Sequence, residues 1–310
     1  MPLPSRRPRP TARCLVSAVA AVGAALLAGC GASTPLSSGG PGGAMAVVAA
    51  ENTWGDMAGQ IGGSRVSVTS IITDPNADPH TYETDARAAA AINGAALVIE
   101  NGAGYDDFVD KIISTNARSG RDVLSIEATV GVGGANPDPH LWYNPDYVTA
   151  AARAIESHLA AHDPADASVF AANLQAFLTA YQPYIDTISA IKSKHAGTSI
   201  SYTERVAGYL VQRAGLTLTT PASFAQSIED GNDPSPADTA VMDRAMTGRT
   251  VKLLLYNAQV TSPATQRVRD LATASGIPVV GVAETIPAGK PSFQAWQIDQ
   301  AAAILAALGG

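Results

Sequence analysis

Residues 164–194 read PADASVFAANLQAFLTAYQPYIDTISAIKSK and contain no strand pattern. Apolar residues recur along this stretch at helical spacing, from Val169 to Ile191. The pattern predicts one helix of about thirty residues, which is long for a globular protein. Pro183 lies inside the stretch and can kink such a helix. We therefore interpret residues 164–196 as a rigid helix that connects two halves of the chain.

On both sides of this helix, short apolar strand patterns alternate with helical patterns. The strands are expected at 46–50, 66–72, 97–100, 122–126, 199–202, 216–219, 251–256 and 277–282. Such alternation indicates parallel sheets flanked by helices. The predicted fold is therefore α/β, with an N-terminal lobe over residues 46–163 and a C-terminal lobe over 197–310. Because a single stiff helix joins the lobes, we expect only limited closure between them.

The N-terminus has the pattern of an export signal. Four arginines precede sixteen small or apolar residues, 14–29, which is shorter than the roughly 20 apolar residues of a spanning helix. The segment ends in Leu27-Ala28-Gly29-Cys30, which resembles the lipobox of bacterial lipoproteins. That resemblance implies a signal peptide over residues 1–29, acylation of Cys30, and an extracytoplasmic protein that is lipid-anchored to the cell membrane. The alternative is an ordinary cleavage site in which Cys30 is incidental.

A tether follows the signal, and composition limits what the folded part can do. Residues 30–45 are rich in Gly, Ser and Pro and predict a flexible segment. The 310-residue chain has a formal charge of −7, which argues against nucleic acid as a partner. Cys14 would be removed with the signal, so the mature chain would have no intrachain disulfide. Its stability must then come from its core, for which 46% hydrophobic residues are sufficient.

A five-residue phrase occurs twice in the N-terminal half. Asn76 to His80 reads NADPH, and Asn136 to His140 reads NPDPH. Proline fixes its own φ angle and biases the preceding residue towards extended geometry, so each histidine is expected on a stiff turn. Both phrases lie where a predicted strand has delivered the chain to the edge of a sheet. Two imidazoles presented in this way indicate a metal site.

Two carboxylates in the C-terminal half lie at equivalent places. Glu204 follows the predicted strand 199–202, and Glu284 follows 277–282. Ligands in α/β proteins gather at the carboxyl ends of parallel strands. Two imidazoles and two carboxylates suit Zn²⁺ or Mn²⁺. The alternatives are a carboxylate at the first turn of a helix for Glu204 and a solvated loop acid for Glu284.

The chain resembles the metal-binding solute receptors of bacterial ABC importers, the zinc and manganese cluster known as A-I. The resemblance is carried by AENTWGDMA (50–58), DPHTYE (78–83), LVIENGAGYDDF (97–108), DPHLWYNP (138–145) and TERVAGYL (203–210), and it continues more weakly to the C-terminus. It implies two α/β lobes joined by a long helix, a metal ion bound between the lobes, and delivery of that ion to a membrane permease. A monomer is expected.

The resemblance carries over residue by residue to the four candidates. His80 and His140 match the family's first two ligands, and Glu204 takes the place of the third, which is His or Glu. The fourth is usually Asp, and Glu284 is the candidate there only if a short deletion is allowed. A Glu as third ligand is associated with manganese in this family, whereas intrinsic affinity favours Zn²⁺ over Mn²⁺. Asp78 and Glu83 are candidate hydrogen-bond acceptors for the histidines.

Three functions are compatible with these residues. The first is a receptor, not an enzyme, that binds a divalent metal and passes it to an ABC permease. The second is a metal-dependent hydrolase that uses the same four groups, although the sequence shows no additional acid or base for it. The third is a surface adhesin, acting in cell adhesion, built on the same fold.

One further pair of histidines is spaced for a shared helix face. His158 and His162 are four residues apart, near the end of the helix predicted over 145–162. They lack the Glu beside the first histidine that zinc proteases of the HExxH type require, because Leu159 stands there. The simpler interpretation is a solvated helix end.

Overall fold

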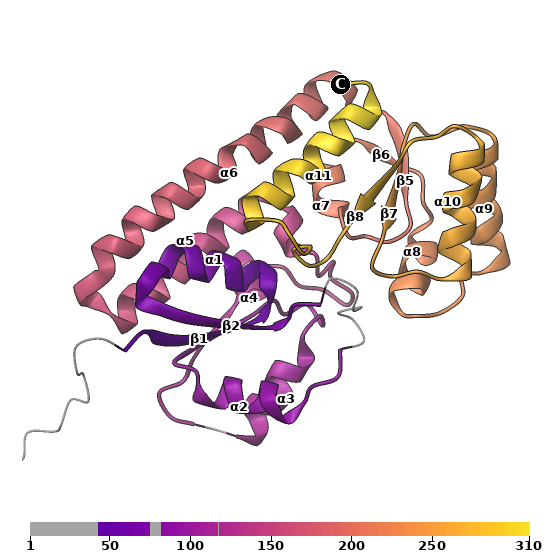
Figure 1. The fold of residues 1–310 in the computed structure, drawn as a ribbon. Helices are drawn as coiled ribbons and strands as arrows, with labels where there is room; N and C mark the ends of the chain where they lie inside the picture. Colours follow the sequence, from indigo (N-terminus) through magenta and orange to yellow (C-terminus); the bar gives the residue numbers. More distant parts are fainter. Residues whose placement is uncertain (1–42, 75–81, 117) are drawn as a thin grey trace, which may run out of the picture. The chain divides into compact units, whose positions relative to one another are not determined.

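Two sheets of parallel strands form the framework of the protein (Figure 1). The computed structural model describes residues 43–74, 82–116 and 118–310. The strand order is β2-β1-β3-β4 in the first sheet and β6-β5-β7-β8 in the second. The strands are β1 Met45–Glu51, β2 Val66–Ile72, β3 Leu97–Glu100, β4 Asp122–Ser125, β5 Ser199–Tyr202, β6 Thr217–Leu218, β7 Leu254–Asn257 and β8 Val279–Val282. The predicted α/β class, with a parallel sheet in each half, is confirmed.

The two sheets share one topology. In each, the first strand in sequence lies between the second and the third, and the fourth pairs with the third. Val47 of β1, for example, lies opposite Val68 of β2 and Leu97 of β3. All the pairings are parallel, so every strand of a sheet ends at the same edge. Residues that directly follow the strands are therefore brought together.

Helices connect the strands of the N-terminal half. They are α1 Asn52–Gly62, α2 Ala86–Gly94, α3 Asp107–Thr115, α4 Ile126–Val130 and α5 Pro145–His162. Local sequence explains several starts: the Asp85 side chain accepts a hydrogen bond from the Ala88 N–H, and Pro145 occupies the first turn of α5. Helix α1 begins at Asn52, whose side chain exchanges two hydrogen bonds with the backbone of Ile286.

The predicted connecting helix is present as α6, Ala167–His195. Pro164–Asp166 forms a separate turn of 3₁₀-helix before it. The buried residues of α6 recur along one side of the helix: Phe170, Leu174, Phe177, Tyr181, Tyr184, Ile188 and Ile191. This side packs against α1, α5 and the C-terminal helix α11, Phe293–Leu308 (Figure 1). Phe177 and Tyr181 lie against the ring of Phe293, so α6 and α11 share one aromatic core.

The C-terminal half differs from the expectation in one helix and in the bounds of strands β6, β7 and β8. Its helices before α11 are α7 Gly208–Arg213, α8 Ala222–Glu229, α9 Pro236–Thr247 and α10 Pro263–Ala274. Helix α8 was not predicted. Strand β7 begins at Leu254 rather than Val251, although Val251 and Leu253 are also buried. Apolar runs that lead into a strand are buried with it, so hydrophobicity alone extends the predicted strand too far.

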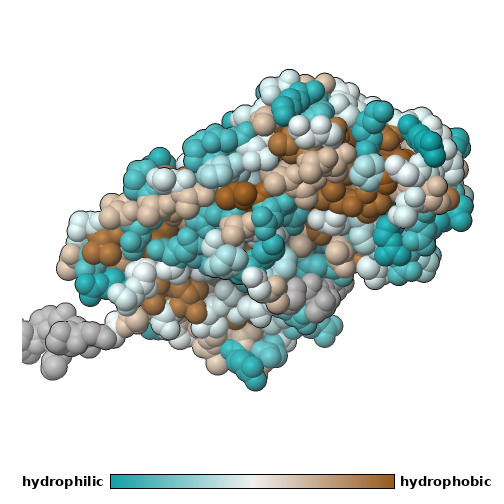
Figure 2. Space-filling model, turned by 45° about the horizontal axis from the view of Figure 1, so that its top comes forward, coloured by the Kyte–Doolittle hydropathy of each residue, from teal (hydrophilic) through white to brown (hydrophobic). Residues whose placement is uncertain are grey.

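The surface view in Figure 2 shows hydrophobic and hydrophilic residues interspersed over the face that it presents. Among the described residues, none of the helices is long and apolar enough to be a candidate membrane span. The described residues, 43–74, 82–116 and 118–310, belong to one compact unit. The lobe boundaries at 163 and 197 stay predictions, as do the signal peptide and the tether, nearly all of which lie outside the described residues.

Candidate metal centre

His140 is buried where a proline-rich loop meets the core. Its side chain is fully buried, and the 3₁₀ turn Leu141–Tyr143 follows it. The Nδ1 atom lies 2.7 Å from Oδ1 of Asp138, which also accepts a hydrogen bond from the His140 backbone N–H at 3.1 Å. Because a carboxylate can only accept, Nδ1 carries the proton when the imidazole is neutral. Nε2 is then the atom with a lone pair, and it lies 3.5 Å from Oε2 of Glu284.

Glu204 and Glu284 meet at the edge of the second sheet. Glu204 lies two residues beyond β5, and Glu284 lies two residues beyond β8. Their side chains are held together by Asn257, whose Nδ2 donates to Oε2 of Glu204 at 2.8 Å and to Oε1 of Glu284 at 2.7 Å. Asn257 is the last residue of β7, the strand that lies between β5 and β8. The strand order therefore places this amide between the two acids.

Burial dominates the electrostatics of these groups. Glu204 is 1% exposed, and burial together with the Glu284 carboxylate raises the pKa of Glu204 to about 9. Burial lowers the pKa of His140, but the carboxylates of Asp138 and Glu284 overcome this and raise it to about 10. The metal-free site therefore holds protons at neutral pH. A divalent cation would replace them, because it stabilises the ionised carboxylates and requires the lone pair of the imidazole.

The loop after β8 is hydrogen-bonded to the N-terminal half of the chain. Tyr105 donates a hydrogen bond from Oη to Oε2 of Glu284 at 2.8 Å, and Tyr143 donates to the carbonyl of Ala283 at 2.8 Å. Glu284 thus contacts His140 and Tyr105 from one half of the chain and Asn257 from the other. The site is built at the boundary between the two sheets.

The His140 loop is held by a second set of hydrogen bonds. The side chain of Asn101 donates to the carbonyl of Pro139 at 2.9 Å and accepts from Trp54 Nε1 at 3.1 Å. From the C-terminal half, Tyr209 donates to the carbonyl of Asp138 at 3.0 Å. Backbone anchored on both sides restricts the imidazole to one position, which a metal ligand requires.

Comparison with known proteins identifies the family. The sequence profile of the zinc-uptake complex component A periplasmic family (ZnuA) matches residues 47–307. The chain belongs to this family. That placement agrees with the resemblance to metal-binding solute receptors of ABC importers.

Two curated relatives are named after metals. The manganese-binding lipoprotein MntA of Halalkalibacterium halodurans is 30% identical over 160 residues, which are 50% of this chain and 52% of MntA. The iron-binding protein YfeA of Yersinia pestis is 31% identical over 133 residues, 39% of this chain and 40% of YfeA. The chain thus spans about half the length of the curated relatives it matches, or less.

Solved structures share the fold over a longer range. The periplasmic zinc-binding protein TroA of Treponema pallidum superposes with a TM-score of 0.72 at 17% identity, covering 86% of this chain and all of TroA. FpvC of Pseudomonas aeruginosa, solved with Mn²⁺, gives a TM-score of 0.72 at 19% identity, covering 86% of this chain and 98% of FpvC. These matches establish the two-lobed fold with its long helix.

The structure brings three of the four predicted ligands together. Asn257 donates hydrogen bonds to Glu204 and Glu284, and His140 Nε2 lies 3.5 Å from Oε2 of Glu284. His80 and the predicted lipidation site Cys30 lie outside the described residues, as does Asp78. Glu83 is exposed. Within residues 43–74, 82–116 and 118–310, no three His, Cys, Asp or Glu side chains already form a group that could hold a metal ion.

Sequence reasoning missed three residues of this site. Sequence reasoning could have identified Asp138, because Asp138 occupies the same position in the second NxDPH phrase as Asp78 does in the first. Asn257 could be found only from the strand order, since nothing local distinguishes it. Tyr105 lies in the loop before α3 and donates to a carboxylate 179 residues away, a contact that no local pattern indicates.

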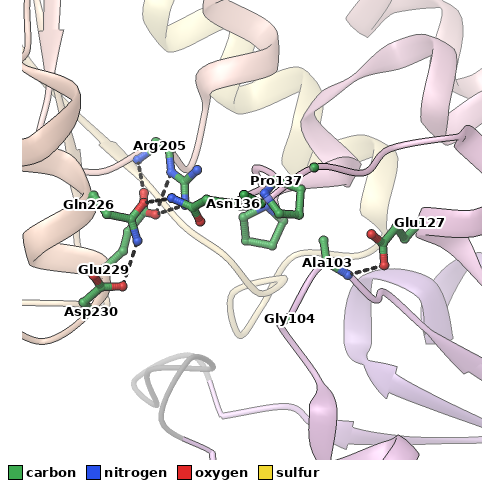
Figure 3. A pocket seen from close by; sticks show the side chains of 12 residues that line it. Ala103, Gly104, Glu127, Asn136, Pro137, Arg205, Gln226, Glu229 and Asp230 are labelled. Carbon is green, nitrogen blue, oxygen red and sulfur yellow. Dashed lines mark hydrogen bonds and ion pairs between the residues drawn. The ribbon is translucent and has the colours of Figure 1, made fainter.

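A polar cavity of about 380 Å³ adjoins the His140 loop at Pro139 (Figure 3). Arg205 and Glu229 pair inside it, with 2.7 Å between Nε and Oε2. Asn136 crosses the cavity to donate a hydrogen bond to Gln226 of α8 at 2.6 Å (Figure 3). Solvent therefore reaches the backbone beside the buried histidine from this side.

Proposed function

We propose that this protein captures a divalent transition metal ion outside the cytoplasm and delivers it to an ABC permease in the membrane. His80, His140, Glu204 and Glu284 are the proposed ligands, and Zn²⁺ or Mn²⁺ is the proposed cargo. The observation that carries the proposal is the buried group of His140, Glu204 and Glu284 at the junction of the two sheets. Buried carboxylates without a cation are unfavourable, so the group is suited to bind one.

The same geometry supports binding rather than catalysis. A catalytic metal keeps one coordination position open to water and needs an acid or base beside it. Here the three described candidates are at most 1% exposed, and the Asp138 carboxylate beside them already accepts from the imidazole and the backbone N–H of His140. The relatives named for manganese and iron, and the ABC substrate-binding lipoprotein FimA of Streptococcus parasanguinis, are consistent with a transport receptor. We propose that the protein acts as a monomer, anchored to the membrane through lipidated Cys30.

Metal binding by purified protein tests the proposal. A receptor should bind one Zn²⁺ or Mn²⁺ tightly, and a hundredfold excess of metal over Kd should add about 2.7 kcal/mol of stability, which raises Tm by about 5–10 °C. His140→Ala should abolish tight binding. His195→Ala is the matched control, because His195 ends α6 and was never a candidate ligand. Competition of Zn²⁺ against Mn²⁺ then ranks the ions.

Two results would refute the proposed function. Tight binding that survives His140→Ala would show that the site is elsewhere. Metal-dependent hydrolysis by the wild-type protein would favour an enzyme. Delivery is tested in cells, where deletion of the gene should reduce uptake of the bound metal and His140→Ala should fail to restore it.

A further inference from the structure

A second cluster of metal-ligating side chains lies away from the proposed centre. His158 and His162 occupy the last two turns of α5, and Asp122 begins β4. His158 Nδ1 lies 2.6 Å from Oδ2 of Asp122, and His162 Nε2 lies 3.2 Å from the same oxygen. Spacing of four residues puts both imidazoles on one face of the helix. The strand adds the carboxylate, which sequence spacing alone does not reveal.

The cluster is accessible to ions from solution. The side chains of His158, His162 and Asp122 are 31%, 28% and 31% exposed. Neighbouring Arg121 turns away from Asp122, because its guanidinium donates to Oδ1 of Asn93 at 3.0 Å. The carboxylate therefore faces imidazoles rather than a permanent cation.

The local field also favours a cation. His162 is the last residue of α5, where the carbonyl groups of the final turn carry partial negative charge. Asp163, the next residue, adds a carboxylate at the same helix end. A dication held here would be attracted by the helix end, by Asp122 and by Asp163.

We propose that His158, His162 and Asp122 form a second, weaker, solvent-open site for Zn²⁺ or a similar imidazole-preferring ion. Two imidazole nitrogens and one carboxylate oxygen are a ligand set that suits such metals, with water completing the shell. This site is independent of the buried centre, since it shares no residue with it.

Small movements would open the cluster around an ion. As they stand, the three side chains are hydrogen-bonded to one another rather than arranged around a metal. Ligand atoms bound tetrahedrally to Zn²⁺ at 2.0–2.2 Å lie about 3.3–3.6 Å from each other. The His162–Asp122 distance of 3.2 Å is close to that range. The His158–Asp122 distance of 2.6 Å must lengthen by about 0.7–1.0 Å, which rotation of the partly exposed Asp122 side chain allows.

Equilibrium dialysis of the purified full chain against Zn²⁺ tests the site. Wild type should bind two ions, one tightly and one more weakly. The His158→Ala/His162→Ala double variant should lose the weaker ion and keep the tight one. The single variant Asp122→Asn, which keeps an acceptor but removes the charge, should weaken the second site at least tenfold. His195→Ala should bind like the wild type.

The outcomes separate this site from the proposed transport function. His140→Ala should lose only the tight ion, so failure of either site leaves the other measurable. A folded wild type that binds a single Zn²⁺ would overturn the inference. So would a double variant with a lower Tm and unchanged Zn²⁺ stoichiometry, because the cluster would then serve only to hold α5 against β4. If the double variant does not fold, His158→Gln and the spectral change on adding a second equivalent of Co²⁺ to the wild type replace it. Unchanged weak binding by His158→Gln, or a second equivalent of Co²⁺ that adds no absorption from imidazole ligation, would also overturn the inference.

Discussion

At the scale of single residues, the partner of each candidate ligand determines what the ligand can do. Asp138 holds a proton of His140 on Nδ1, so Nε2, which lies 3.5 Å from Oε2 of Glu284, is the nitrogen that a metal would use after displacing the other proton. Asn257 donates to both acids and reduces their repulsion in the metal-free protein. The second NxDPH phrase led to His140, which the structure places next to Glu284, and its role as a ligand stays a prediction. The phrase did not reveal Asn257, because the position of that amide depends on which strands become neighbours.

Replacing Asp138 with Asn tests this division of roles. The amide retains the size of the carboxylate but not its charge, so the imidazole loses its fixed orientation and part of its basicity. We expect Zn²⁺ affinity to fall about 10–100-fold, as it does when such supporting acceptors are changed in metal proteins. Competition with a fluorescent chelator measures the change.

The control for this variant is Asp146→Asn, an exposed acid that pairs with Arg213 at the surface. Its effect on affinity should be negligible, since exposed ion pairs contribute little. An affinity of the Asp138 variant equal to that of the wild type would mean that Asp138 does not orient the ligand.

At the scale of secondary-structure elements, parallel strands gather acids at one edge. Besides the candidate ligands, Glu51 ends β1 and Glu100 ends β3, and Asp106 lies close by at the start of α3. Burial raises the pKa of Glu51 well above its usual value, that of Glu100 to about 7 and that of Asp106 to about 6. Asp106 nonetheless accepts hydrogen bonds from the backbone of Asn101 and Gly102.

These pKa shifts predict the direction in which stability depends on pH. A carboxyl group with a raised pKa binds its proton more tightly in the folded state than in the unfolded state. Its contribution is therefore fully present below its unfolded pKa, near 4, and is lost as pH rises through the folded value. For Asp106 and Glu100 the window is about pH 4 to 7. The free energy of unfolding of the metal-free protein should fall across it.

Urea unfolding with EDTA at pH 5 and pH 8 measures this fall. Glu100→Gln should flatten the profile, because glutamine has no proton to lose. Glu156→Gln on the outer side of α5 is the control and should leave the slope unchanged. A wild-type stability that rises from pH 5 to pH 8 would contradict the assignment.

The helices and strands also show which structural features sequence patterns can predict and which they cannot. Helix α5 and strand β3 begin and end at the predicted residues, because the cap of α5 and the apolar run of β3 are local. Helix α8 was missed because eight residues, ASFAQSIE, give too short an apolar period to recognise. Local patterns likewise do not indicate the hydrogen bonds between the Asn52 side chain and the backbone of Ile286, because these residues are 234 positions apart.

At the scale of the whole described chain, one connecting helix and one packed terminal helix constrain movement. Helix α11 belongs to the C-terminal half, yet it packs on α6 and also touches α1 of the other half. Hydrogen bonds from Tyr105 and Tyr143 hold the Glu284 loop across the same boundary. We therefore expect release of a bound ion to depend on withdrawal of this loop rather than on wide separation of the halves.

The Tyr143→Phe variant tests this expectation. It removes the hydrogen bond to the Ala283 carbonyl but keeps the buried ring, which packs edge-on against Trp296. The loop that carries Glu284 should then withdraw more often, so the dissociation rate of Zn²⁺ should rise several-fold while the association rate changes little. A hydrogen bond worth about 0.5–1.5 kcal/mol corresponds to roughly 2–13-fold in rate. Stopped-flow transfer of Zn²⁺ to excess chelator measures the dissociation rate.

Tyr147→Phe is the control for this variant, because the Tyr147 ring packs on Tyr209 and not on the loop that carries Glu284. Equal dissociation rates in the wild type and Tyr143→Phe would mean that another movement limits release, and scattering curves with and without Zn²⁺ would then have to show the halves moving apart.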